Sequence, residues 1–320
     1  MKIYLSGQMS SHPKTEIKWL KESGCQYRCF TYYYMCKSAP GWKESYYDTF
    51  LANLDAGQGI MLDSGAHTVQ HWLVHTSRKM NLQSKVPDLL NRMFDSYIEF
   101  CLKWKDKLDF YVTFDYSPTA KLTWEASERM FQAGLRPCVV FHGDDSITWL
   151  DKYVERGYDY IGISGVTTAR ARGRRRERFS YLDSCFRQLS RGESKPQVKT
   201  HGFAVTAFNL MGAYPWTSVD SSTWMKAAVY GKVLIPSDHS TSVRMIRIST
   251  RGAGEDSYWH YGAHQKKILD QLFKSCHTTA EELGSEKEDG QIARKLFNAR
   301  IFANWRQTTD EFKPRFERLF

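Results

Sequence analysis

Short runs of β-branched, aromatic and aliphatic residues alternate along the chain with longer stretches in which apolar positions recur every three or four residues. The first pattern favours strands and the second favours helices. Eight strands are predicted, at Ile3–Ser6, Arg28–Met35, Gly59–Leu62, Asp109–Phe114, Pro137–Phe141, Tyr160–Ile163, Gln197–Phe203 and Ser218–Asp220. Helices are predicted between and after them, at Pro13–Glu22, Lys43–Leu54, Val86–Lys107, Leu122–Ala133, Ile147–Arg156, Tyr181–Ser190, Ala207–Met211 and Trp224–Tyr230.

Eight strands that alternate with helices predict an α/β fold, a (β/α)8 TIM-type barrel that covers residues 1–235. An open doubly wound sheet is the alternative, but no Gly-x-Gly-x-x-Gly turn follows any strand. Residues 236–320 form a mostly helical C-terminal extension that we expect to pack on the barrel. Two strand-like runs lead into this region and three helices are predicted within it: Lys232–Pro236, Val243–Ser249, His264–Cys276, Thr279–Glu288 and Ile292–Arg306.

The composition is that of a globular chain. Of the 320 residues, 42% are hydrophobic and 25% are charged, which is enough apolar material to bury a core. No apolar run approaches the roughly 20 residues of a membrane helix, so no membrane association is predicted. The seven cysteines are scattered and odd in number, without a Cys-x-x-Cys pair. This usage predicts reduced thiols and a cytoplasmic protein.

The net charge of +10 predicts a polyanionic partner. Part of this charge is concentrated in one arginine block that follows the sixth predicted strand. Such a block is either a solvated loop or a segment that contacts phosphates. Its members are Arg170, Arg172, Arg174, Arg175, Arg176 and Arg178.

Polar residues and glycines gather at the carboxyl ends of strands three to eight, and in a barrel these ends share one mouth. The residues expected to face one another there are Asp63, Asp115, His142, Gly165, His201 and Asp220. Paired carboxylates favour glycosyl chemistry, in which one attacks an anomeric carbon and the other transfers protons. The oxygens of Asp115 suit the N–H groups of a guanine-like base. The alternative for each carboxylate is a helix cap or another structural hydrogen bond.

Several segments that follow successive strands resemble, in the same order, motifs of the tRNA-guanine transglycosylase superfamily. The resemblance covers roughly residues 1–235, and the order makes it more specific than any single motif. The segments are Asp63-Ser64-Gly65-Ala66, Phe114-Asp115-Tyr116-Ser117-Pro118, Phe141-His142-Gly143, Ile161-Gly162-Ile163-Ser164-Gly165, Gly202-Phe203-Ala204 and Val219-Asp220-Ser221-Ser222-Thr223-Trp224.

The resemblance implies base exchange without a required cofactor. Asp220 would be the nucleophile that displaces guanine and forms a covalent glycosyl-enzyme, and Asp63 would be the general acid and base. A 7-deazaguanine base would then attack the intermediate. The implied base-binding residues are Ser64, Gly65, Asp115, His142, Gly143, Ser164 and Gly165, and the arginine block would hold the phosphates that flank the reacting nucleotide.

The chain departs from the superfamily at its zinc site. The Cys-x-Cys-x-x-Cys cluster is absent, and Cys276 is the one cysteine in that region. A zinc site of altered composition stays open, because His239, His260, His264 and His277 lie nearby in the sequence; no metal ligand is assigned. A compact, basic chain without this cluster is most similar to the phage-type DNA 7-deazaguanine transglycosylases, which would act in the host cytoplasm.

We therefore expect DNA as the nucleic-acid substrate, with tRNA as the alternative. A guanine in duplex DNA must leave the base stack before a nucleophile reaches its sugar. Tyr116, His67 and Trp216 are candidates to stack on the extruded base, or are core residues instead. Two further readings are a catalytically inert nucleic-acid-binding barrel and a hydrolytic glycosidase. The oligomeric state is not predicted.

Overall fold

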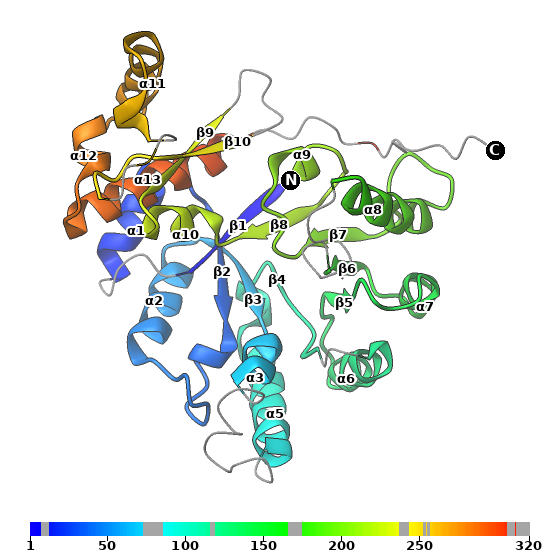
Figure 1. The fold of residues 1–320 in the computed structure, drawn as a ribbon. Coiled ribbons are helices and arrows are strands. Elements are labelled where there is room, and N and C mark those ends of the chain that lie inside the picture. Colours follow the sequence, from blue (N-terminus) through cyan, green and yellow to red (C-terminus); the bar gives the residue numbers. More distant parts are fainter. Residues whose placement is uncertain are drawn as a thin grey trace.

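The computed structural model describes residues 1–7, 13–72, 86–115, 119–165, 175–236, 243–251, 254, 257–305 and 311 of the chain. Eight parallel strands form one sheet at the centre of the molecule (Figure 1). Each lies where the alternating pattern predicts a strand. They are β1 (Lys2–Ser6), β2 (Tyr27–Thr31), β3 (Gly59–Asp63), β4 (Phe110–Tyr111), β5 (Val139–Phe141), β6 (Tyr160–Ile163), β7 (Lys199–Gly202) and β8 (Ser218–Ser221).

The sheet closes on itself. Its order is β4-β3-β2-β1-β8-β7-β6-β5, so the first and last strands in sequence lie side by side. A parallel bridge between Val112 and Cys138 joins the two outer strands. Two backbone hydrogen bonds support this bridge, from Cys138 N to the Tyr111 carbonyl (2.8 Å) and from Thr113 N to the Cys138 carbonyl (3.0 Å). The predicted (β/α)8 TIM-type architecture is confirmed.

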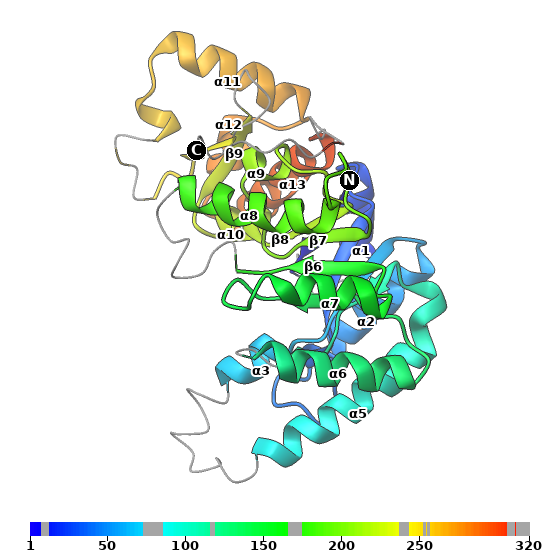
Figure 2. The ribbon, with the colours of Figure 1, turned by 90° about the vertical axis from the view of Figure 1, so that its right-hand side faces the viewer.

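Helices surround the strands, as Figures 1 and 2 show. Each helix buries one apolar face against the outside of the sheet, which is the packing that an amphipathic sequence dictates. In chain order they are α1 (Pro13–Glu22), α2 (Glu44–Asp55), α3 (Ala66–Trp72), α5 (Val86–Trp104), α6 (Ala120–Gln132), α7 (Thr148–Arg156), α8 (Arg175–Ser190), α9 (Phe208–Met211) and α10 (Thr223–Val229).

Alternate residues of each strand point into the barrel. Its interior is filled by a cluster that includes Tyr4, Cys29, Met61, Val140 and Tyr160. The next inward position along a strand lies two residues later and faces the mouth. By this period, inward residues of β2, β3, β5 and β8 are followed by polar ones: Cys29 by Thr31, Met61 by Asp63, Val140 by His142 and Ser218 by Asp220.

The remainder of the chain packs against α10 and α1. It contains the antiparallel hairpin β9 (Lys232–Pro236) and β10 (Val243–Arg247), followed by α11 (Ala263–Ser275), α12 (Ala280–Gly284) and α13 (Glu288–Asn304). On α13, the buried Asn298 donates to the carbonyls of Trp224 (3.0 Å) and Lys232 (3.3 Å) and accepts from the Leu234 N–H (2.8 Å). The hairpin begins before the boundary predicted at residue 235, and the same apolar cluster runs through the barrel and this appended region.

Several elements differ in extent from the sequence prediction. β2 ends at Thr31 rather than at Met35, because the Thr31 N–H donates to the Tyr46 hydroxyl (3.0 Å) and a 3-10 turn, Tyr32–Tyr34, buries Tyr32 and Tyr33. A short helix, α3, lies where no helix was predicted. α12 ends at Gly284 and not at Glu288, because the Ser285 backbone turns out of the helical conformation (φ −58°, ψ 136°).

All seven cysteines lie within the described residues, and all are free thiols; Cys276 is partly exposed and the others are buried. Among the helices that the structure describes, none combines the length and the apolar character needed to cross a bilayer.

Candidate active site

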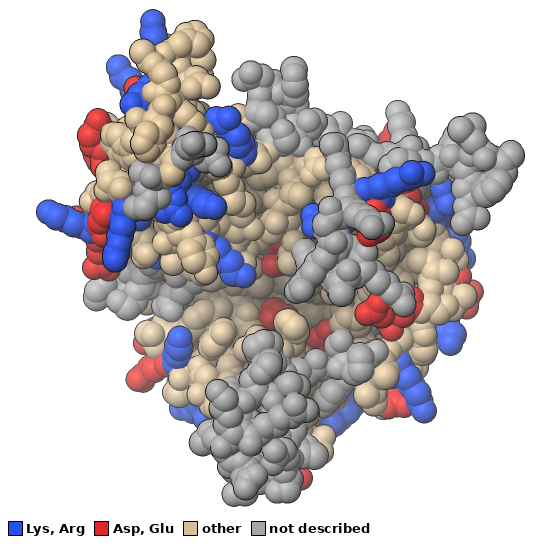
Figure 3. Space-filling view, viewed as in Figure 1, with Lys and Arg blue, Asp and Glu red and all other residues tan. Residues whose placement is uncertain are grey.

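A cavity of about 540 Å³ lies at the carboxyl ends of the strands. Figure 3 shows it as a hollow in one face of the molecule, with acidic side chains at its centre and basic ones mostly on the surrounding surface. It is lined by residues of the strands, of the segments that directly follow them and of α3: Ser6, Cys29, Thr31, Met61, Asp63, His67, Thr68, Val112, Asp115, Val140, His142, Ser164, Gly165, Phe203, Ala204 and Asp220.

Asp220 projects into this cavity from β8 and is held by two hydrogen bonds. Its Oδ2 accepts from the Ser6 hydroxyl (3.0 Å), and its Oδ1 accepts from the Ala204 backbone N–H (2.7 Å). Ser6 is itself fixed, because the Trp224 indole N–H donates to its carbonyl (2.9 Å). Ala204 has a positive φ of 52°, an uncommon conformation for a residue with a side chain that turns its N–H toward the carboxylate. The carboxylate is therefore held in one orientation by the protein itself.

Asp63 lies across the same cavity, at the end of β3. Burial raises the pKa of its carboxyl, and the negative charges of Asp115 and Asp220 raise it further. Hydrogen bonds from the Thr31 side chain and the Gly65 N–H act in the opposite direction, and the pKa is about 7. A carboxyl group with this pKa holds and releases a proton near neutral pH, which is the property that a general acid and base requires.

Asp115 and His142 form a second polar pair in the cavity. The His142 Nε2 lies 3.2 Å from the Asp115 Oδ2, and both side chains are mostly buried. Burial lowers the pKa of His142, but its hydrogen bond and charge interaction with Asp115, followed by Asp145 and Asp144, outweigh burial and raise it. The pair presents an N–H donor next to a carboxylate acceptor. Two neighbouring groups of a heterocyclic base, one a carbonyl and one an N–H, match this arrangement.

The structure brings most of the predicted site residues together. Those that line the cavity are Asp63, Asp115, His142, Ser164, Gly165 and Asp220. Ser64, Gly65, Gly143 and His201 are not among the residues that line it, and His201, which was expected at the mouth, is fully buried. Ser64 is fully buried, and its hydroxyl accepts from the Ala66 N–H (3.3 Å).

Gly65 and Gly143 are explained by close packing within the protein. Gly65 has a φ of +77°, and a Cβ atom at this position would lie 2.6 Å from the Cβ of Tyr33. At Gly143 a Cβ atom would lie 3.3 Å from the Cα of Gly165. Gly65 is thus required by the turn that directs its N–H to Asp63, and Gly143 permits the close approach of two loops.

Part of the predicted nucleic-acid surface lies outside the described residues. This applies to Arg170, Arg172 and Arg174, to the side chain of Arg175, and to Tyr116. Helix α8 begins at Arg175; on its first turn Arg176 is exposed and Arg178 is partly buried. Of the other stacking candidates, His67 lines the cavity. Trp216 is a core residue, because it is 2% exposed and packs edge-on against Phe186.

Sequence reasoning missed the residues that support the carboxylates. Ser6, at the carboxyl end of β1, obeys the same strand-end rule that identified Asp63 and Asp115. Thr31 was hidden inside a predicted strand that was too long. Ala204 contributes a backbone N–H, and a backbone group leaves no signal in the residue types.

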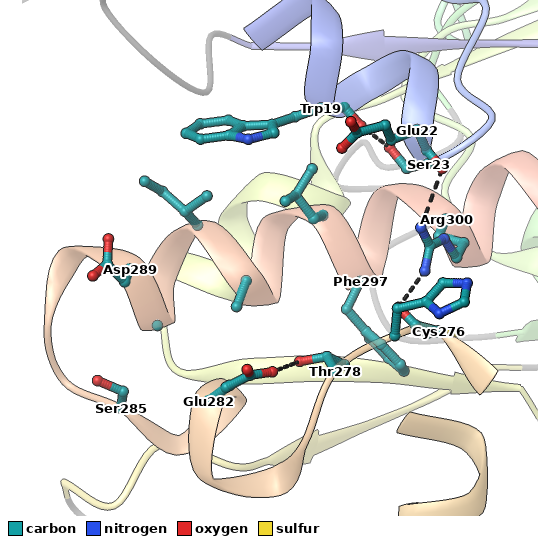
Figure 4. A pocket seen from close by; sticks show the side chains of 15 residues that line it. Trp19, Glu22, Ser23, Cys276, Thr278, Glu282, Ser285, Asp289, Phe297 and Arg300 are labelled. Carbon is teal, nitrogen blue, oxygen red and sulfur yellow. Dashed lines mark hydrogen bonds between the residues drawn. The ribbon is translucent and has the colours of Figure 1, made fainter. Parts of the chain in front are cut away.

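A second cavity, of about 530 Å³, lies between α1, α12 and α13 (Figure 4). Its polar groups serve the structure. Arg300 donates to the carbonyls of Cys276 and Glu22, and Glu282 accepts from the Thr278 hydroxyl (2.9 Å) and caps α12. Apolar side chains that line it include Phe297 and Trp19. Three carboxylates line this cavity as well, but Figure 4 shows Glu22, Glu282 and Asp289 lying apart. The barrel mouth, where Asp63, Asp115 and Asp220 line one cavity, is therefore the candidate active site.

The histidines near Cys276 in the sequence had left a zinc site of altered composition open. Within the part of the chain that the structure describes, no three or more His, Cys, Asp or Glu side chains are grouped to hold a metal ion. The Nδ1 of His260 lies 3.0 Å from the Gly254 carbonyl. His239 lies outside the described residues.

Comparison with known proteins gives this chain no family. No protein-family model matches the sequence, and no curated protein matches it. Among solved structures, a similar chain is the one described as "Structural study of Project ID from Aquifex aeolicus VF5". It has 13% sequence identity and a TM-score of 0.40, over 70% of this chain and 84% of that chain.

Proposed function

We propose that this protein is a base-exchange glycosyltransferase that replaces guanine in DNA with a 7-deazaguanine derivative. The observation that supports it best is the convergence of Asp63, Asp115 and Asp220 in one cavity at the barrel mouth. Asp220 is held by donors, and Asp63 has a pKa of about 7. A fixed carboxylate opposite a proton-transferring carboxyl is the arrangement that covalent glycosyl transfer requires.

In the first half of the proposed reaction, a carboxylate oxygen of Asp220 attacks C1′ of the nucleotide. The glycosidic bond between C1′ and N9 breaks, and its electron pair stays on the leaving guanine. Protonated Asp63 donates its proton to that base, so guanine leaves as a neutral molecule. The product is an ester between Asp220 and the deoxyribose.

In the second half, the incoming base reacts at the same carbon. Ionised Asp63 accepts the proton from N9–H of the 7-deazaguanine, N9 bonds to C1′, and the ester bond to Asp220 breaks with its electron pair returning to the carboxylate. Each residue ends in its starting state. Asp63 acts as acid in one half and base in the other, which a pKa near neutrality allows.

Asp115 and His142 are proposed to orient both bases. An Asp115 oxygen accepts from ring or exocyclic N–H groups, while His142 donates to the carbonyl oxygen next to them. Guanine and 7-deazaguanine share this edge, so one pocket serves both halves of the exchange. The choice of guanine-type bases, and of DNA over tRNA, rests on the sequence resemblance.

For duplex DNA, the target nucleotide has to be extruded into the cavity. The net charge of +10 supports a role in holding the flanking phosphates. Helix α8, which carries Arg176 and Arg178, is linked to the mouth by the hydrogen bond from the Tyr181 hydroxyl to the Ser164 carbonyl (2.6 Å).

Incorporation of radiolabelled guanine tests the proposal. Purified protein is incubated with labelled guanine and either duplex DNA or tRNA. We expect label in DNA, and no label with Asp220→Asn, which keeps the side-chain volume but is a poor nucleophile. Label in tRNA alone would reassign the substrate, and nucleic-acid binding without incorporation would favour an inert binder.

The covalent step has its own test. Denaturing gels of protein mixed with labelled DNA should show an adduct that hydroxylamine cleaves, as expected for an aspartyl ester. Its absence in wild type would contradict the mechanism. Abasic sites that accumulate without added base would instead indicate a hydrolase.

A further inference from the structure

A series of buried, hydrogen-bonded side chains lies inside the barrel, beneath Asp220. The hydroxyl of Tyr160 on β6 lies 2.6 Å from the hydroxyl of Ser218 on β8, and that oxygen lies 2.6 Å from Nδ1 of His201 on β7. The other ring nitrogen, Nε2, lies 3.5 Å from Oδ1 of Asp220. In the strand register, His201 pairs with Ser218, so neighbouring inward positions build the series.

His201 has no contact with solvent. Its side chain is 0% exposed, and its ring packs against Phe203 at 4.6 Å and Phe110 at 5.3 Å between centroids. Within the described part of the chain, Nε2 makes no hydrogen bond of normal geometry. This nitrogen is the unsatisfied end of the hydrogen-bonded series. A buried N–H without an acceptor costs about 1–3 kcal/mol. The Asp220 carboxylate is the acceptor in front of it.

Both contacts of Ser218 can run in either direction, and the tautomer of His201 decides between them. The direction that directs an N–H at Asp220 has Tyr160 donating to Ser218 and Ser218 donating to Nδ1 of His201. The imidazole then carries its own proton on Nε2, toward Asp220. In this arrangement each hydroxyl donates once, each hydrogen bond polarises the next, and the Nε2–H of His201 is directed at Asp220.

We propose that His201 is a positioning residue for Asp220, whose Nε2–H holds Oδ1 and leaves Oδ2 to attack the sugar. Oδ1 also accepts the fixed Ala204 N–H, whereas Oδ2 faces the rotatable hydroxyl of Ser6. Hydrogen bonds of this kind are often long before substrate binds and shorten in the complex. This inference rests on the proposed function of Asp220.

The same contact serves both halves of the exchange. When Oδ2 bonds to C1′, Oδ1 becomes the carbonyl oxygen of the ester and still accepts from His201. When the incoming base attacks, the C1′–Oδ2 bond breaks and its electrons return to the carboxylate, which the two N–H groups stabilise as a leaving group. No proton passes through His201 in either step.

Steady-state exchange kinetics test the role. His201→Phe should lower kcat about 100-fold and leave KM for the incoming base within twofold, because Asp115 and His142 are untouched. His201→Gln should recover to within about 10-fold of wild type, since its amide N–H reaches the same acceptor. Equal loss in both variants, or no loss of kcat in His201→Phe, would overturn the proposal.

Serine and tyrosine variants provide matched controls. Ser218→Ala removes the donor to Nδ1 and should lower kcat about 10-fold, whereas Ser221→Ala, equally buried on β8 but bonded to the Thr223 N–H (3.1 Å), should not. Likewise Tyr160→Phe should slow exchange and Tyr158→Phe, whose hydroxyl contacts Glu128 (2.9 Å), should not. If His201→Phe fails to fold, an equal kcat for Ser218→Ala and Ser221→Ala would overturn the proposal.

Nitrogen-15 NMR of histidine-labelled protein reads the contact without any substrate. His201, assigned from the His201→Gln variant, should carry a proton on Nε2, and Asp220→Ala should shift that resonance. An Nε2 without a proton, or no shift in Asp220→Ala, would overturn the inference. Absence of exchange with this NMR result intact would instead refute the proposed function and leave the His201–Asp220 contact standing.

Discussion

At the scale of residues, the two opposed carboxyl groups of the cavity differ in what surrounds them. Asp220 accepts hydrogen bonds from a hydroxyl and a backbone N–H. Asp63 also has donors, but burial and two neighbouring negative charges outweigh them in setting its pKa. The two carboxyl groups are the same residue type in different surroundings, and the two roles proposed for them rest on that difference.

The stability of the fold should respond to Asp63. A folded-state pKa of about 7 lies above the ordinary value of 3.8, so this carboxyl favours folding most below pH 3.8, and the contribution is lost as the pH rises through 7. The full difference corresponds to about 4 kcal/mol. Asp63→Asn should therefore raise the free energy of unfolding at pH 8 by about 2–4 kcal/mol and change it little at pH 4. Urea titrations at both pH values measure this, and equal effects at both would contradict the assigned pKa.

The two halves of the proposed exchange should depend on pH in opposite senses. Guanine release needs protonated Asp63, so its single-turnover rate should fall above about pH 7. Attack by the incoming base needs ionised Asp63, so decay of a preformed adduct should accelerate up to the same pH and then level off. Rapid-quench measurements separate the steps. Binding is measured at each pH, because His142 also has a raised pKa; parallel pH profiles for the two steps would argue against a shared acid and base.

The strand-end rule predicted the carboxylates but not which neighbours face the cavity. Side chains alternate along an extended chain, so Asp63 and Ser64 cannot both point inward; Ser64 is turned away and buried. The predicted barrel already places β1 and β7 beside β8, so the strand-end rule also applies to Ser6. His201 was expected at the mouth, but its side chain is fully buried next to Asp220.

At the scale of elements, a buried ion pair ties α1 to β2 near the site. Arg28 Nη2 lies 2.6 Å from Glu16 Oε1 and donates to the Gly7 carbonyl (2.7 Å), directly after Ser6. Both side chains are almost completely buried. The pair thus fixes the end of β1, from which Ser6 reaches Asp220.

Breaking this pair should be costly. Glu16→Gln leaves the Arg28 charge buried without its carboxylate and should lower the free energy of unfolding by about 3–5 kcal/mol. The control is Glu125→Gln on α6, whose 3.8 Å pair with Lys121 is exposed and should contribute less than about 0.5 kcal/mol. Chemical denaturation measures the free energy of unfolding of both variants. A similarly small loss in both would show that other groups compensate the buried charge of Arg28.

The periodic patterns predicted where strands and helices occur better than where they end. Tyr32, Tyr33 and Tyr34 favour strand by residue type, yet they form a 3-10 turn, in which Tyr32 packs with Tyr97 and Phe100, and Tyr34 packs with Tyr46. Their partners lie far along the chain, on α5 and α2. Tertiary packing of this kind overrides local propensity, and it shortened β2 so that Thr31 became part of the site.

At the scale of the whole molecule, the appended helices belong to the same core as the barrel. Apolar residues of α13 pack in the cluster that also contains Leu5 of β1 and Val219 of β8. Arg294 on the same helix donates to the Ala228 carbonyl on α10 (3.0 Å). Barrel and extension should therefore unfold together.

A single substitution on α13 tests this coupling. Asn298→Ala removes three hydrogen bonds to α10 and β9. It should lower the free energy of unfolding by about 2–4 kcal/mol, and the protein should still unfold in one cooperative transition. Asn304→Ala, at an exposed position of the same helix, should change it little. Two separate transitions in calorimetry would contradict a shared core.

Binding to nucleic acid should depend strongly on salt. With a net charge of +10, raising KCl from about 50 to about 200 mM should weaken binding to a short DNA duplex at least ~10-fold, because phosphate contacts release counterions. Binding of the uncharged free base, measured by calorimetry, is the control and should not change. A Kd for DNA that does not change with salt would contradict the proposed contacts between basic side chains and phosphates.

The pairing of β4 with β5 that closes the barrel is short, so the protein can be divided into two fragments at this place. Val112 and Cys138 form the bridge that joins β4 to β5, whereas β1 and β8 are aligned over four residue pairs. The connection between Ala133 and Pro137 lies next to this seam, so a chain cut there loses little pairing between strands. The two pieces, each with four consecutive strands, should reassemble as complementary fragments along β1 and β8. Ser6 would then come from one fragment and Asp220 from the other. Exchange activity in a mixture of the two fragments would therefore show that β1 and β8 had paired again.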